Sequence, residues 1–213
     1  VLLVVPATHA SDPPILQPSD ILKQTTVGAP EVSPDGSWVA YSVSRYCPKH
    51  EKRVGDIFLV PLGGGEPRRL TSGESVEKAY SWSPDSSTVV FSAKRGDDEK
   101  SQIYAIKIDG GEARRVTSLE TGASNPMYSP DGTMIAVTSS VGELHTEEQR
   151  EAFGDVRYAM HPRFYHLGRG WDDGSRKRIF VSPAKGGEAR QLTDGECADE
   201  GDHSMVWSPD STE

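Results

Sequence analysis

Cysteine is scarce in this sequence, and long apolar runs are missing beyond its N-terminal segment. Only Cys47 and Cys197 occur among 213 residues, so the chain is not a disulfide-stapled scaffold, and their spacing matches no zinc-ligand pattern. Two free thiols or one long-range bridge are the alternatives for this pair. No other apolar stretch approaches the roughly 18 residues of a transmembrane helix, so no membrane span is expected.

Basic residues are also in the minority. Lys and Arg number 23 against 32 Asp and Glu, a formal net charge of −9, and no basic stripe offsets the acidic residues. Nucleic acid and anionic membranes are therefore poor candidates for the main partner. By contrast, 21 Gly and 15 Pro are what many short strands joined by tight turns need. The composition favours a folded, all-β protein.

Catalytic and metal-binding motifs are missing as well. No stretch reads Gly-x-Ser-x-Gly, the strained turn that exposes the nucleophile of α/β-hydrolases. The six histidines include no His-Glu-x-x-His arrangement, and His161 and His166 have no flanking carboxylate in such a pattern. We assign no catalytic, cofactor-binding or metal-binding residue, and we expect no cofactor.

The sequence opens on a short apolar run, Val1-Leu2-Leu3-Val4-Val5, which leads through Ala7 and Ala10 into a polar Ser-Asp-Pro-Pro stretch. This pattern resembles the end of a secretory signal peptide cleaved after Ala10, and a buried N-terminal strand is the alternative. We predict an exported protein, periplasmic or secreted, with a cytoplasmic location left open.

What the sequence does contain is a repeat. The tripeptide Ser-Pro-Asp occurs four times, beginning at Ser33, Ser83, Ser129 and Ser208. A short β-prone run follows each of the first three copies. Ser, Pro and Asp suit the first three corners of a type I turn, because Pro fixes φ near −65° at the second. Each copy is therefore expected to close a hairpin.

A second motif, Gly-Gly-Glu-x-Arg-x-Leu/Val-Thr, recurs later in each unit, beginning at Gly64, Gly110 and Gly186. Its Gly pair supplies positive φ for a second hairpin turn. The first two copies lie 46 residues apart, near the roughly 40 to 50 residues of a four-stranded propeller blade.

The strands carry apolar residues on both faces, as in the run 38–43. A propeller blade packs against a neighbour on each side, whereas a two-layer sandwich leaves one face wet. We predict a partial β-propeller of four-stranded antiparallel blades, about three plus the start of a fourth in a truncated chain. The expected division is a signal-peptide remnant (1–10), a lead-in (11–27), blade 1 (28–73), blade 2 (74–119), blade 3 (120–195) and the start of blade 4 (196–213).

The third unit holds an insertion at 140–176, between its second and third strands. Its first part, 143–153, is charged and free of Gly and Pro, consistent with a short helix on the rim. Its second part gathers cationic and aromatic residues that are candidate contacts for a substrate or for another domain: Arg157, Arg163, Tyr165, Arg169 and Trp171. The arginines suit a carboxylate or carbonyl group, and the alternative is pairing within the insertion with Asp155, Asp172 or Asp173.

These repeats resemble those of TolB-like propellers and of the propeller domain in prolyl oligopeptidase family serine peptidases. The segments 155–157, 163–166, 171–174 and 178–181 resemble the acylaminoacyl-peptidase and dipeptidyl-peptidase branch. The resemblance implies a propeller that gates peptide access to a Ser-Asp-His triad in a C-terminal α/β-hydrolase domain of the same chain. The alternative is a TolB-like periplasmic propeller that binds other proteins and performs no chemistry.

Overall fold

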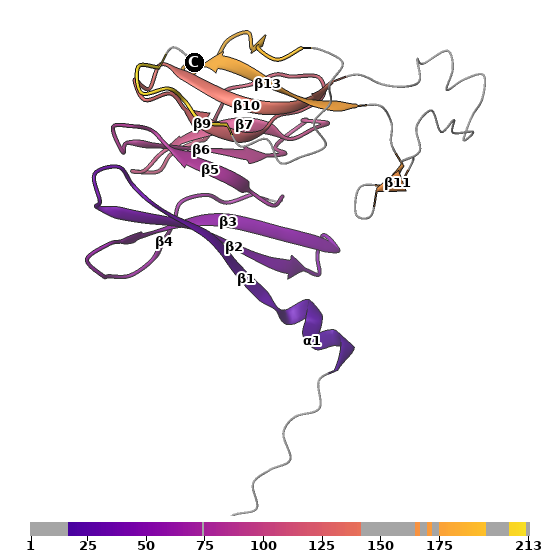
Figure 1. Ribbon diagram of the computed structural model, residues 1–213. Helices are drawn as coiled ribbons and strands as arrows, with labels where there is room; N and C mark the ends of the chain where they lie inside the picture. Colours follow the sequence, from indigo (N-terminus) through magenta and orange to yellow (C-terminus); the bar gives the residue numbers. More distant parts are fainter. Residues whose placement is uncertain are drawn as a thin grey trace, which may run out of the picture.

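The computed structural model describes residues 17–73, 75–141, 165–166, 170–171, 175–194 and 205–211. One short helix, α1 (Pro18–Lys23), precedes a succession of strands. These form three four-stranded antiparallel sheets and one two-stranded pair. The three sheets are stacked face to face in chain order (Figure 1), which confirms the predicted partial propeller of four-stranded blades.

Each sheet is one blade, and its strands follow one another in space as in sequence. Blade 1 comprises β1 (Thr25–Val32), β2 (Trp38–Cys47), β3 (Lys52–Pro61) and β4 (Arg68–Arg69). Blade 2 comprises β5 (Lys78–Trp82), β6 (Thr88–Ala93), β7 (Gln102–Lys107) and β8 (Arg114–Arg115). Blade 3 comprises β9 (Ser124–Tyr128), β10 (Met134–Val141), β13 (Arg176–Pro183) and β14 (Arg190–Gln191).

The Ser-Pro-Asp turns close the first hairpin of each blade, as the sequence predicts. In blade 1 the N–H of Gly36 donates to the carbonyl of Ser33 at 2.8 Å. The Ser33 hydroxyl donates to the carboxylate of Asp35 at 2.5 Å and accepts the N–H of Trp38 at 2.9 Å. The hydrogen bonds that the Asp35 carboxylate accepts, first from the Ser33 hydroxyl and then from the N–H of Ser37, lower its pKa to about 2. In each turn the carboxylate of the aspartate thus accepts a hydrogen bond from the serine of the same turn.

The Gly pairs close the second hairpin, and this prediction is also confirmed. Gly64 and Gly65 have φ values of 93° and 143° between β3 and β4, a region that favours glycine. Gly110 and Gly186 begin equivalent turns with φ values of 97° and 88°. Both turn types lie at one end of the sheets, which we call the turn end.

Both faces of the middle blade are buried, as the sequence predicts. Along β6, Val89 and Phe91 belong to the apolar cluster shared with blade 1, whereas Val90 belongs to the cluster shared with blade 3. The alternation of a strand places these neighbours on opposite faces. In β7, Tyr104 faces blade 1 and Ile103 faces blade 3 in the same way. The core therefore lies between the sheets.

Arginines of the Gly-Gly-Glu motif tie each blade to the next. Arg68 donates to the main-chain carbonyl of Ile108 in blade 2. Arg114 donates to the carbonyls of Lys185 and Ala184 in blade 3, at 2.7 and 2.9 Å. The first Arg of the repeated Arg-Arg pair is thus an inter-blade link, a role that the turn argument does not predict.

The first strand of each blade contains a bulge that the sequence analysis does not predict. Ala29, Ala79 and Asn125 lie four residues before their Ser-Pro-Asp turns and have φ values of 47°, 43° and 50°. The pairing register shifts beside each of them. Non-glycine residues rarely adopt such values, so the repeat carries a strained backbone position on its first strand.

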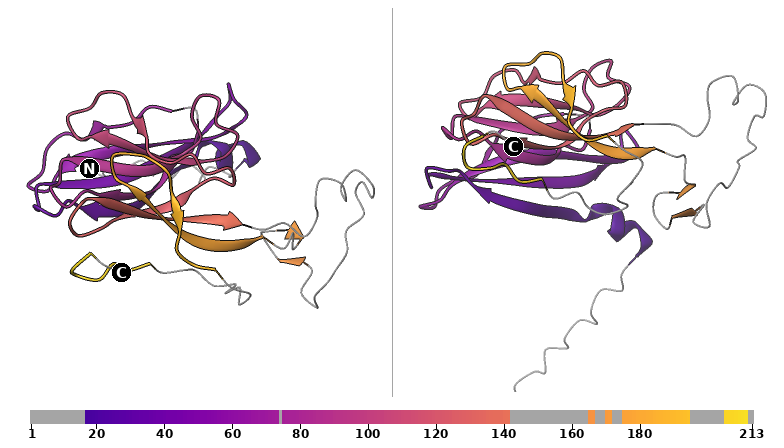
Figure 2. Two further views of the ribbon diagram at one scale, coloured as in Figure 1. Left: turned by 90° about the horizontal axis from the view of Figure 1, so that it is seen from above. Right: turned by 45° about the horizontal axis from the view of Figure 1, so that its top comes forward.

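The insertion branches off blade 3 at the end of the sheet that is opposite to the turn end. β10 runs to Val141 and pairs there with Arg176, the first residue of β13. Within the insertion, β11 (Tyr165–His166) and β12 (Gly170–Trp171) form an antiparallel pair. Figure 1 and both views of Figure 2 place this pair beyond the end of β13. We call this the insertion end of the sheets.

Several expectations fall on residues outside the described ones. These are the signal-peptide segment 1–10, the helix expected at 143–153 and Cys197. Cys47 is a free thiol in the structure. β1 starts at Thr25, inside the segment 11–27 that is expected to lead into the repeats, because residues 25–28 pair with 42–45 of β2.

Candidate binding cavity between blades 1 and 2

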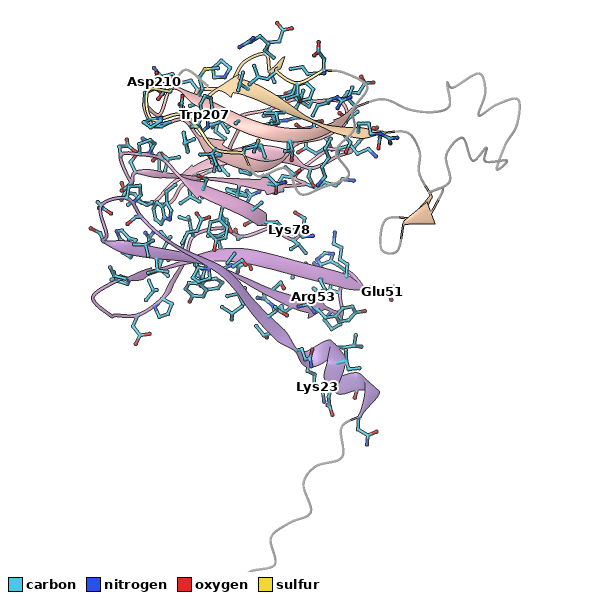
Figure 3. The ribbon with its side chains drawn as sticks, in the orientation of Figure 1. Lys23, Glu51, Arg53, Lys78, Trp207 and Asp210 are labelled. Atoms are coloured by element: carbon cyan, nitrogen blue, oxygen red, sulfur yellow. The ribbon has the colours of Figure 1, made fainter. Side chains whose placement is uncertain are left out.

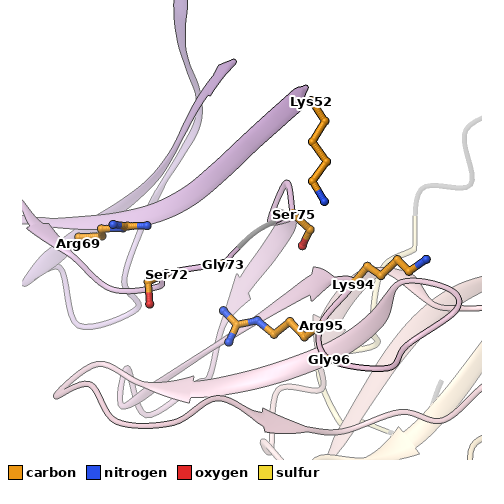
Figure 4. A pocket seen from close by; sticks show the side chains of 8 residues that line it. All are labelled: Lys52, Arg69, Ser72, Gly73, Ser75, Lys94, Arg95 and Gly96. Carbon is orange, nitrogen blue, oxygen red and sulfur yellow. The ribbon is translucent and has the colours of Figure 1, made fainter. Parts of the chain in front are cut away.

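A cavity of about 660 Å³ opens between the first two blades. Its lining comes from three connections, shown in Figure 4: Lys52, Arg69, Ser72, Gly73, Ser75, Lys94, Arg95 and Gly96. Lys52 begins the third strand of blade 1, and 94–96 follow the second strand of blade 2. Connections between second and third strands share one end of a propeller blade, so this cavity lies at the insertion end. Figure 3 shows Arg53 and Lys78 at this end, and Trp207 and Asp210 at the turn end.

One wall is built around the buried carboxylate of Asp56, whose side chain is 1% exposed. Arg69 donates from Nη2 to Asp56 Oδ1 at 2.7 Å and from Nε to the carbonyl of Thr71 at 2.9 Å. The N–H of Gly73 donates to the same carboxylate oxygen at 3.3 Å. These bonds hold the guanidinium of Arg69 at the cavity edge.

The opposite wall is built around Glu77, whose side chain is fully buried. Arg95 forms an ion pair with Glu77, and its guanidinium lies over the rings of Phe91 and Tyr104, at 5.0 and 5.6 Å from their centroids. Burial raises the pKa of Glu77, and its hydrogen bond with Thr71 and the charge of Arg95 oppose this shift. Arg95 is thus held between a carboxylate and two aromatic faces.

The two lysines of the lining have no such partners. Both Lys52 and Lys94 are exposed, and neither is in an ion pair or hydrogen bond with any residue that the structure describes. Because Arg69 and Arg95 are already paired with carboxylates, the two ammonium groups leave an excess of positive charge among the described residues of the lining. Such a cavity attracts anions.

Two buried donors of the lining also lack hydrogen-bond partners. These are the hydroxyl of Ser75 and Nε of Arg95, and the neighbouring carboxylate oxygens Asp56 Oδ2 and Glu77 Oε2 also lack hydrogen-bond partners. Buried polar atoms are nearly always hydrogen-bonded in folded proteins, and each exception calls for an explanation. Both donors belong to residues that line the cavity.

The equivalent position between blades 2 and 3 carries a leucine. There the N–H of Leu119 donates to Gln102 Oε1 at 3.1 Å, in the position where Gly73 donates to Asp56. Leu119 packs against the apolar cluster between blades 2 and 3. The two blade interfaces therefore differ at this point of the repeat, where Gly73 lies close to Glu77 and Leu119 contributes an apolar side chain.

The structure describes two of the five candidate contact residues that were named from the sequence. Tyr165 and Trp171 are register partners in the β11–β12 pair. Arg157, Arg163 and Arg169 lie outside the described residues. The sequence analysis missed the cavity because its lining comes from two different repeats, and the Lys94-Arg95-Gly96 run after a strand was the available signal.

In the part of the chain that the structure describes, no group of three His, Cys, Asp or Glu side chains is placed to hold a metal ion. Within the same ranges no helix has the length and apolar character to cross a bilayer.

Stacked four-stranded antiparallel sheets, linked from each repeat to the next by the same side chains, define a section of a β-propeller. Residues 21–159 match the TolB beta propeller domain family, and the chain belongs to this family. The resemblance of its repeats to TolB-like propellers is thereby confirmed.

Similar proteins include peptidases. The chain is 31% identical over 200 residues to the uncharacterized peptidase YuxL of Bacillus subtilis (strain 168), covering 92% of this chain and 30% of that protein. Among solved structures, the putative TolB from Agrobacterium tumefaciens is 25% identical with a TM-score of 0.55, over 84% of this chain and 53% of that one. The acylaminoacyl peptidase of Pyrococcus horikoshii is 16% identical with a TM-score of 0.63, over 81% of this chain and 25% of that one, a likeness of fold.

Proposed function

We propose that this chain is the propeller part of a serine peptidase of the prolyl oligopeptidase family, where it restricts peptide access to a separate α/β-hydrolase domain. The observation that carries the proposal is the 31% identity to a peptidase over 92% of this chain, within a protein of which the match covers only 30%. The remainder of such a relative has room for a catalytic domain. The chemistry is then peptide hydrolysis by a Ser-Asp-His triad outside this chain.

The packing of the blades supports a gating role. Apolar clusters fill the space between neighbouring sheets, and Arg68 and Arg114 bond across to the next blade. A wall of this kind excludes folded proteins while short peptides pass. We further propose that the substrates are short or N-blocked peptides, and that the protein is exported.

The candidate residues of the insertion have a place in this proposal. Arg157, Arg163 and Arg169 would contact the peptide or the hydrolase domain, together with the β11–β12 segment that carries Tyr165 and Trp171. This segment lies at the insertion end, the end at which the cavity between blades 1 and 2 also opens.

A second candidate is a TolB-like propeller that binds other proteins without chemistry. The family match over residues 21–159 and the 25% identity to the Agrobacterium tumefaciens protein favour it. The two candidates differ in whether the full-length protein contains a reactive serine.

Treating the full-length protein with a fluorophosphonate probe tests the proposal. We expect covalent labelling of one serine outside residues 1–213, together with hydrolysis of N-acetylalanine p-nitroanilide that is lost after labelling. Absence of both labelling and hydrolysis, with stable capture of a protein partner, would favour the binding propeller instead.

A further inference from the structure

We infer that the cavity between blades 1 and 2 is a carboxylate-binding site for peptides, receiving either a C-terminal carboxylate or an Asp or Glu side chain. The choice of a peptide ligand rests on the proposed function. The cavity itself is assigned from its own charges, its unpartnered donors and its position.

The charge of the lining sets the sign of the ligand. Four cationic side chains border the cavity, and the paired carboxylates Asp56 and Glu77 compensate only two of them. Among the residues that the structure describes, the charges without a paired carboxylate belong to Lys52 and Lys94. In Figure 4 the side chain of Lys52 points from the end of its strand toward Ser75, while the side chain of Lys94 extends at the cavity edge in the direction away from Arg95.

The unpartnered donors indicate the kind of anion. Ser75 and Arg95 each leave a buried donor without an acceptor, and a carboxylate has two oxygens that accept such bonds. Arg95 is already fixed by Glu77 and by the rings of Phe91 and Tyr104. Because its position is set before the ligand arrives, binding does not have to immobilise it.

The size of the cavity argues for more than a small ion. A volume of about 660 Å³ lies within the roughly 300 to 1,000 Å³ of ordinary ligand pockets. The glycine at position 73 allows the close approach of the Glu77 carboxylate that fixes Arg95, since a Cβ there would lie 2.9 Å from Glu77 Oε1 and 3.9 Å from Arg95 Nη2. The end of a peptide, with its flanking residue, fits such a space.

Titration of three small peptide analogues against the full-length protein, followed by ligand-observed NMR, tests the site. The probes are N-acetylalanine, N-acetylalaninamide and N-acetylaspartic acid α-amide. N-acetylalanine carries a terminal carboxylate, the second probe carries none, and the third has only a side-chain carboxylate. We expect one or both acids to bind at least about fivefold more tightly than the neutral amide, and their ranking tells which source of carboxylate is preferred.

Two double variants of equal charge change locate the binding. Lys52→Gln with Lys94→Gln removes the uncompensated cations, and we expect the Kd for the preferred acid to rise at least about fivefold. Lys107→Gln with Lys185→Gln makes the same charge change on exposed residues at the turn end, and the Kd should stay within about twofold. All four side chains are exposed, so the thermal midpoints should stay close to that of the unmodified protein.

Equal affinity for N-acetylalaninamide and both acids would overturn the inference. An equal loss of affinity in the two double variants would do so too, because it would show an effect of net charge alone. Binding of the peptide analogues is measured without turnover. Loss of the preference for acids is therefore compatible with labelling by the serine probe, and a preference for acids can be observed even where labelling is absent.

Discussion

Trp207 donates its indole N–H to the main-chain carbonyl of Met127 at 3.2 Å, and Trp82 makes the equivalent bond to Glu31 at 3.3 Å. In both cases a Trp that directly precedes a Ser-Pro-Asp turn reaches the first strand of the preceding blade. Residues 205–211 therefore lie against blade 3 as the corresponding part of blade 2 lies against blade 1. Figure 3 shows Trp207 beside blade 3.

The turns repeat this relationship. The N–H of Asp35 donates to the Ser86 hydroxyl, and the N–H of Asp131 donates to the Ser211 hydroxyl, each at 3.0 Å. Between blades 2 and 3 the acceptor position is occupied by Gly132, which has no hydroxyl. The two serine links join blade 1 to blade 2, and blade 3 to residues 205–211.

Replacing Trp82 by Phe tests the indole link. We expect the free energy of unfolding to fall by about 1–3 kcal/mol, because the Glu31 carbonyl loses its donor and the smaller ring leaves a void in a side chain that is 6% exposed. Urea denaturation followed by circular dichroism measures the change. Trp207→Phe, at a less buried position, should cost less, and a larger loss there than at Trp82 would contradict this view of the interface.

Substitutions of Ala79 test whether the bulge in the first strand of blade 2 is strained. At a φ of 43° a glycine avoids the steric penalty of Cβ, so we expect Ala79→Gly to raise stability by up to about 1 kcal/mol, although glycine in an ordinary strand lowers it. Ala79→Val should cost about 1–3 kcal/mol. Thermal unfolding of both variants, with Ala29→Gly as the equivalent change in blade 1, measures the effect. Destabilisation by both glycines would show that the bulge carries no strain.

The sequence indicated those parts of the fold that depend on local chemistry. Ser33-Pro34-Asp35 and Gly64-Gly65 predict their hairpins because the turn conformations restrict which residues fit. The bulge at Ala79 has no such signature, since neither alanine nor its sequence neighbours favour a positive φ. The cavity was not predicted either, because its lining residues belong to two repeats that only the packing of blades 1 and 2 brings together.

The pKa of Asp35 gives a pH-dependent test. Hydrogen bonds, first that of the Ser33 hydroxyl, lower the pKa from 3.8 to about 2. A carboxyl whose pKa is lower in the folded state stabilises the fold above its unfolded pKa, and this contribution is lost as the pH falls from about 4 toward 2. NMR titration of the Asp35 carboxyl carbon should give the lowered value, and Ser33→Ala should move it back toward 3.8. An ordinary pKa in the unmodified protein would rule out the turn geometry.

The buried pair of Glu77 and Arg95 gives a stability test. Arg95→Ala leaves Glu77 without its cation, and we expect a loss of about 3–5 kcal/mol near neutral pH. Because burial already raises the pKa of Glu77, the variant should recover stability as the pH falls and the carboxyl takes up a proton. Urea denaturation at several pH values measures this. Adding Glu77→Gln should restore part of the loss, and a double variant as unstable as Arg95→Ala would contradict the pairing.

Gating itself is measured most directly by how the rate of hydrolysis depends on substrate length. With the full-length protein, kcat/KM would be compared for an acetylated tripeptide and for the same scissile sequence within a folded domain. A variant that combines Arg68→Ala and Arg114→Ala loosens the wall, since it removes the bonds to Ile108, Ala184 and Lys185. We predict strong preference for the tripeptide, reduced in the loosened variant, whereas equal kcat/KM for both substrates in the unmodified protein would contradict a gating propeller.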